Sequence, residues 1–412
     1  MRFIINQDKY SANIFWKLCN YLILIDTING FFLLKGVPLP IGQAYKFFLM
    51  LFLAYQLVKT RRGQILVTLT ICYFLIYINH VNLNNNSNYL SECIILFSKF
   101  VIVPWIYVYL IQVKNESSPF TFWNNCINCF RLNITFLCAN IFSGLFGIGG
   151  HTYEDRIGYK GFLYAVNEVS GFAAVLFSLF LYYIYISHQN SKKVYYLYSV
   201  LFLITALLFG TKTMLIIILV SVYYIPHIIS PSNKEKRKKN KFTKLIILVL
   251  SIVVVIYGGI FIVNEMGFLD RWTYFYQQGG IERVIFSGRD EYWLNAKKEF
   301  FSSTLYTQLL GLGKNQTVEM DQFDILLNFG YVGIVIIYSF YFKLIIQAYQ
   351  CKNKYNISKL IFFVDTLLLG VSCIAGHILF SGLLGPFLGI INSLFNMPNY
   401  VVHKKSTLKH KQ

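Results

Sequence analysis

Two cationic side chains lie in polar intervals of an otherwise apolar chain, where they could bind an anion. Lys212 belongs to the short interval 210–213, between two apolar runs. Arg289 belongs to the longer polar interval 265–320. A guanidinium group presents a planar fork of donors that fits phosphate oxygens, and an ammonium group supplies a compact positive charge. The two residues therefore indicate a site for an anion such as pyrophosphate.

Each cation also has a simpler interpretation. Lys212 could be a lysine at a helix end whose ammonium group extends to the membrane surface. Arg289 could form a weak surface ion pair with Asp290 or Glu291, its neighbours in the sequence. Two aromatic residues that follow closely offer faces for stacking on sugar rings, which favours binding of a glycan: Tyr292 and Trp293.

Asn167 and Glu168 lie near the start of the apolar run 161–187. A carboxylate at membrane depth costs a few kcal/mol, so it normally faces a cavity or a partner of opposite charge. Glu168 could therefore belong to a binding site, with Asn167 beside it. It could equally be an interfacial residue paired with Lys160 or Arg156.

A second polar group opens the apolar run 321–348. Asp321, Asp324 and Asn328 have i, i+3, i+7 spacing, so they share one face of the predicted helix. The helix dipole alone accounts for Asp321 at the N-terminus, whereas Asp324 and Asn328 lie deeper and are candidates for function. His377, near the end of another run, could accept a proton or be a packing residue. Cys126 and Cys129 form a CxxC pair, but no partners of compatible spacing stand nearby, and we expect no metal and no other cofactor.

The composition of the chain predicts which kind of structure positions these residues. The chain has 412 residues, of which 56% are hydrophobic and 13% charged, against about 25% charged in a soluble domain. Its apolar surface requires a bilayer as solvent. A membrane helix needs about 20 mostly apolar residues. We read about twelve such runs, which predicts an all-α, multi-pass membrane protein: 14–34, 41–58, 64–80, 90–112, 121–147, 161–187, 194–209, 211–229, 243–264, 321–348, 358–379 and 381–398.

The net charge of +19 is spread over short loops. Lys and Arg residues follow every second apolar run, which places those loops and both termini in the cytoplasm. This distribution indicates membrane topology rather than binding of nucleic acid. The predicted organisation is nine transmembrane helices in 1–264, one large extracytoplasmic loop in 265–320, and three helices with a basic tail in 321–412.

Several short motifs occur in a fixed order: the segment from Arg156 to Glu168, Leu-Phe-Gly-Thr-Lys-Thr at 208–213, Ser-Gly-Arg-Asp-Glu-Tyr-Trp at 287–293, Gly-Leu-Gly at 311–313, and Asp-Ile-Leu-Leu-Asn-Phe-Gly-Tyr-Val-Gly at 324–333. In their order and in the hydropathy of the whole chain they resemble the O-antigen polymerase and O-antigen ligase superfamily. Within it, the chain looks most like the Wzy-type polymerases of surface polysaccharide synthesis. The resemblance implies a helical membrane fold like that of the GT-C class of glycosyltransferases.

The resemblance also implies a reaction and a place. The enzyme would lie in the bacterial cytoplasmic (inner) membrane, with its active site facing the periplasm. It would transfer a growing glycan from polyprenyl diphosphate to a sugar hydroxyl of an incoming lipid-linked repeat unit. Arg156, Lys212 and Arg289 would stabilise the leaving diphosphate. Asp324 or His377 would accept the proton of the hydroxyl. The remaining candidates would contact the substrate: Asn167, Glu168, Tyr292, Trp293 and Asn328.

The expected partners are the lipid-linked oligosaccharide, membrane lipid and a chain-length regulator protein. Members of the superfamily often have Arg where Lys212 stands, and Lys lacks the bidentate fork. Two alternatives stay open. One is the O-antigen ligase, which moves a finished chain onto the lipid A core. The other is a flippase of lipid-linked oligosaccharides, which is not an enzyme of glycan transfer.

Overall fold

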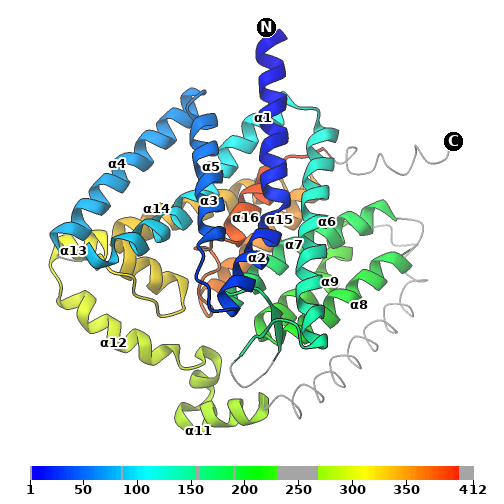
Figure 1. Cartoon of the computed structure of the whole chain (residues 1–412). Helices are drawn as coiled ribbons and strands as arrows, with labels where there is room; N and C mark the ends of the chain where they lie inside the picture. The colour runs from blue at the N-terminus through cyan, green and yellow to red at the C-terminus, as the bar shows by residue number, and fades with distance from the viewer. Residues whose placement is uncertain (1, 85–86, 154–157, 189–191, 230–267, 399–412) are drawn as a thin grey trace.

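The chain is helical almost throughout in the computed structural model (Figure 1). The structure describes residues 2–84, 87–153, 158–188, 192–229 and 268–398. Within these ranges the one sheet is a short antiparallel hairpin of β1 (Gly150–His151) and β2 (Tyr159–Gly161). The predicted all-α class is therefore confirmed.

Among the described residues, six helices are long and apolar enough to cross a membrane. They are α4 (Arg61–Leu83), α5 (Leu90–Glu116), α6 (Pro119–Ser143) with its continuation η2 (Gly144–Phe146), α7 (Val166–Ser187), α9 (Lys212–Ile229) and α14 (Asp321–Cys351). The pair α1 (Arg2–Asn20) and α2 (Leu22–Leu34) makes a seventh if this bent pair is one span. The protein is thus a multi-pass helical membrane protein.

The other predicted runs correspond to shorter helices or lie outside the described residues. The run 243–264 belongs to the second group, so the predicted total of about twelve spans stays a prediction. The remaining elements are η1 (Ser87–Tyr89), α3 (Ile41–Leu57), α8 (Lys193–Phe209), α11 (Phe268–Phe286), α12 (Arg289–Ser302), α13 (Leu305–Leu310), α15 (Asn356–Ser372) and α16 (Leu384–Ser393). Figure 1 shows α11 and α12 below the main bundle.

Helix α7 lies at the centre of the bundle, and nearly all of its residues are buried. Helix α16 packs beside it, with the rings of Phe172 and Phe387 in edge contact at 4.7 Å. On its other side α16 approaches α5 closely. A Cβ atom at Gly385 or Gly389 would come within 2.7 Å of an isoleucine side chain of α5. Small residues of this kind let membrane helices pack closely, which fixes the position of α16.

The connection between α15 and α16 is not helical, although the sequence predicted one continuous run over 358–379. Non-helical backbone at membrane depth needs acceptors for its N–H groups. Asp321 of α14 accepts from the N–H groups of His377, Ile378 and Leu379, the last at 2.7 Å. Glu168 of α7 also accepts hydrogen bonds in this connection, from the Ser381 hydroxyl at 2.7 Å and from the Leu383 N–H at 3.2 Å. Two carboxylates that are distant in the sequence therefore supply the acceptors.

Helix α14 is broken at Gly330, where φ is 64° and ψ is −164°. A Cβ atom there would lie 2.4 Å from the carbonyl group of Leu309 in α13. Glycine tolerates this left-handed backbone and permits the close approach of α13. The break at Gly330 therefore lets α13, which precedes α14 in the sequence, pack against α14.

Candidate functional site

A cavity of about 930 Å³ lies where several helices meet, and we call it the main cavity. Four of the predicted site residues line it: Asn167, Lys212, Arg289 and His377. They come from four segments that are far apart in the sequence. The polar remainder of its wall consists of Thr152, Tyr153, Tyr164, Thr211, Thr213, Ser287, Glu319 and Thr366.

Three helices present their first turns to the main cavity. Asn167 lies at the start of α7, Lys212 at the start of α9, and Arg289 at the start of α12. A helix N-terminus carries N–H groups without intrahelical partners and the positive end of the helix dipole. Both favour an anion. The cavity therefore combines two side-chain cations with three positive helix ends.

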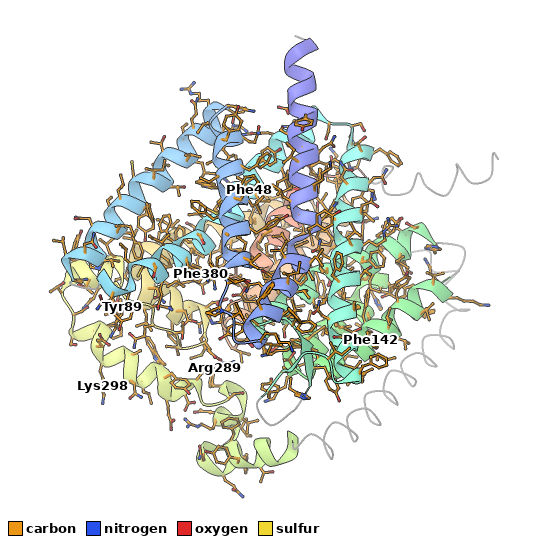
Figure 2. All side chains as sticks on the ribbon, viewed as in Figure 1. Phe48, Tyr89, Phe142, Arg289, Lys298 and Phe380 are labelled. Atoms are coloured by element: carbon orange, nitrogen blue, oxygen red, sulfur yellow. The ribbon has the colours of Figure 1, made fainter. Side chains whose placement is uncertain are left out.

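Arg289 is held by contacts distant in sequence. Its Nε and Nη2 atoms donate to Oε2 of Glu319 at 3.1 and 2.9 Å, and Nη1 donates to the Ile374 carbonyl at 2.9 Å. The predicted alternative, a pair with Asp290 or Glu291, is wrong. Those two carboxylates bind Arg283 instead, at 2.8 and 2.6 Å. Figure 2 shows Arg289 at the end of α12 that faces the bundle.

Lys212 is the first residue of α9, and its Nζ lies 3.5 Å from the carbonyl oxygen of Val284 in α11. Its ammonium group is therefore directed at the cavity wall formed by α11. Beside it the cavity becomes apolar along α9, one face of α15 and the chain just after α15, with Ile216, Leu367, Val371 and Ile374. The main cavity thus has one polar wall and one apolar wall, as the binding of an amphipathic ligand requires.

His377 lies in the non-helical connection rather than at a helix end. Its φ is 64°, and its backbone N–H donates to Asp321. Burial lowers the pKa of its imidazole below the usual value of 6.5. Among the described residues, three non-glycine residues have positive φ: Ser287, Glu319 and His377. All three line the main cavity, and strained backbone of this kind concentrates at functional sites.

Asp324 and Asn328 are buried, but neither lines the main cavity. Asp324 accepts from the N–H of Val318, and Asn328 both accepts from and donates to the backbone of Gln316, at 3.2 and 2.7 Å. Their shared helix face therefore fixes the chain just before Glu319. Sequence reasoning did not select Glu319, which carries no motif of its own.

Tyr292 and Trp293 also lie away from the main cavity. Tyr292 is 61% exposed, and Trp293 stacks on Phe323 with ring centroids 3.8 Å apart. Trp293 therefore packs α12 onto α14. Arg156 lies outside the described residues.

Glu168 lies in the first turn of α7 but is directed into the bundle. Its Oε1 pairs with Lys99 Nζ of α5 at 3.1 Å. Lys46 of α3 pairs with Asp26 of α2 at 2.8 Å, and the side chains of both lysines come within 3.8 Å of the Cβ position of Gly382. We call Asp26, Lys46, Lys99 and Glu168 the central ion cluster. Its members Asp26, Lys46 and Lys99 were missed, although each is a charged residue inside a predicted membrane run.

Within the described part of the chain, no group of three or more His, Cys, Asp or Glu side chains is arranged to hold a metal ion. The residues that line the main cavity offer electrostatic stabilisation by its cations, with a histidine and a carboxylate nearby to exchange protons. Comparison with protein-family models, curated proteins and solved structures finds no match for this chain.

Proposed function

We propose that this protein polymerises polyprenyl-diphosphate-linked oligosaccharide repeat units, and that the main cavity binds the diphosphate. The observation that carries the proposal is the meeting of Lys212, Arg289 and three helix N-termini in one cavity with an apolar wall. The substrate also combines an apolar part with an anionic part, because it joins a lipid to a sugar through a diphosphate. The motifs that resemble the O-antigen polymerases include both cations.

The proposed reaction needs charge stabilisation above all. The hydroxyl oxygen of the incoming unit attacks the anomeric carbon of the growing chain, and the bond to the diphosphate oxygen breaks. Negative charge then develops on the diphosphate, where Lys212 and Arg289 stabilise it. His377 is the base that accepts the hydroxyl proton, because it is the histidine that lines the same cavity among the described residues.

The activity should respond to pH through His377. Burial lowers its pKa, so the neutral form that can accept a proton persists to a pH below 6.5. The charged groups that act on it are Glu168, Lys99, Glu319 and Arg289. We expect the rate to stay constant around neutral pH and to fall only on acidification to below pH 6.5, the usual pKa of an imidazole. The measurement is the polymerisation rate of purified protein between pH 5 and 8.

A His377→Ala variant is the control for that profile. We expect it to keep a small residual rate without the acidic decline. An acidic decline of the same shape in the variant would show that another group titrates, and His377 would lose its role as the base.

The proposed topology has about twelve spans, cytoplasmic termini and a main cavity open to the periplasm. Basic residues in alternate loops support it. We expect a reporter fused after Lys241 to behave as cytoplasmic and one inserted at Gly280 to behave as periplasmic. The reverse pair of results would place the cavity on the wrong side of the membrane for this reaction.

Deletion of the gene separates the proposed function from its alternatives by the glycans that remain. Lipid A core carrying a single repeat unit identifies a polymerase. Bare core with accumulated lipid-linked polymer identifies a ligase, and unpolymerised lipid-linked units on the cytoplasmic face identify a flippase. The proposal predicts the first pattern, and either of the other two overturns it.

A further inference from the structure

Glu319 is the carboxylate that fills the donor fork of Arg289. One of its oxygens receives two hydrogen bonds from the guanidinium, at 3.1 and 2.9 Å. The Glu319 side chain is 51% exposed and borders the main cavity, whereas the Arg289 side chain is only 15% exposed. The carboxylate can therefore leave into the cavity, while the guanidinium stays in place.

The backbone holds Glu319 in this position. Its φ is 62°, a left-handed conformation that glutamate rarely adopts. The preceding residue, Val318, donates its N–H to Asp324. Gly376, next to His377, packs directly on the Glu319 backbone, where a Cβ atom would lie 2.5 Å from the carbonyl carbon. Several segments thus fix a strained residue so that its carboxylate reaches Arg289.

We infer that the Glu319 carboxylate competes with the substrate's diphosphate for the guanidinium of Arg289. The diphosphate displaces Glu319 when the substrate binds, and Glu319 displaces the diphosphate product after transfer. The inference rests on the proposed function, since it takes the ligand of the main cavity to be a diphosphate. A carboxylate and a phosphate present the same kind of acceptor to a guanidinium fork. Both cannot occupy the fork at once.

Competition of this kind would help the enzyme to release its product. Polyprenyl diphosphate leaves the transfer reaction with more negative charge than it had as the sugar ester, so two cations and three helix ends hold the product more tightly than the substrate. The return of Glu319 to Arg289 offsets part of that difference. Product release is a frequent limit on the rate of an enzyme.

The test is the binding of inorganic pyrophosphate to purified protein in detergent, measured by titration calorimetry. Glu319→Gln removes the charge of the competitor. Glu319→Asp keeps the charge, shortens the side chain, and suits a left-handed backbone better than glutamate does. We expect both variants to bind pyrophosphate roughly threefold more tightly or better than the unmodified protein. The matched control is Glu299→Gln, since Glu299 pairs with Lys314, is 48% exposed and lies outside the main cavity.

Each outcome has one meaning. A gain in both Glu319 variants and none in the Glu299 variant supports competition, and adding Arg289→Ala to Glu319→Gln should remove the gain. A gain in Glu319→Gln alone would be a field effect of the lost charge, and it overturns the inference. Equal binding by all variants overturns the inference but leaves the proposed function. If no variant binds pyrophosphate, both fail.

Discussion

Replacing Arg289 with alanine is expected to abolish polymer formation while the abundance of the protein in the membrane stays unchanged. Removal of a positioned donor that stabilises developing charge costs about 10²- to 10³-fold in rate. Arg289 is the one arginine that lines the main cavity among the described residues, and its fork points at Glu319 and Ile374 there. The measurement is the ladder of glycan lengths in a deletion strain that carries the variant gene.

Two further variants make that result interpretable. Lys298→Ala changes an exposed cation on the same helix, away from the bundle, and should leave the ladder unchanged (Figure 2). Arg289→Lys keeps the charge but loses the bidentate fork, so we expect a shortened ladder. A normal ladder from Arg289→Ala would exclude the residue from catalysis, and loss of the protein itself would assign it a structural role.

The second large effect is expected on stability, from Lys99→Ala. This change leaves Glu168 buried without the ammonium group that now lies 3.1 Å away. Loss of one partner of a buried ion pair costs about 3 to 5 kcal/mol, and we expect about 3 kcal/mol because the Lys99 side chain is 22% exposed. The Glu168 carboxylate also holds Ser381 and Leu383, so the connection before α16 should loosen as well. Thermal denaturation in detergent measures the loss as a lower Tm.

A compensating variant tests the cause of that loss. Lys99→Met combined with Glu168→Gln removes both charges while keeping side chains of similar length, and it should recover most of the stability. The explanation fails if Lys99→Ala unfolds at the same temperature as the unmodified protein. It also fails if the double variant is no more stable than Lys99→Ala.

The class of the protein followed from the sequence because hydropathy is a local property. Long apolar runs with few charges predict membrane helices wherever they occur. The cations Lys212 and Arg289 could also be selected, since each lies in a polar interval between apolar runs. The structure brings both to the main cavity, together with Asn167 and His377.

The parts that the sequence did not predict depend on contacts between distant segments. The run 358–379 ends early because Asp321 and Glu168 supply acceptors to the following backbone, and local hydropathy contains no sign of those helices. Glu319 reaches Arg289 across 30 residues of sequence. Lys99 was overlooked inside an apolar run, although a charged side chain at membrane depth normally has a buried partner.

Asp324 and Asn328 show what a periodic pattern predicts and what it leaves open. Their spacing predicted one helix face, and both are buried. That face binds the backbone of Val318 and Gln316, so it positions Glu319 instead of lining the cavity. Periodicity identifies a face of a helix, but the segment packed against it decides what the face does.

Reconstitution tests the central claim most directly. Purified protein in lipid vesicles would receive the lipid-linked repeat unit isolated from its own host, and the products would be separated by size and identified by mass spectrometry. The account predicts glycans that grow by whole repeat units, with one polyprenyl diphosphate released for each bond formed. Repeat units that remain unjoined in the presence of intact, folded protein would contradict it.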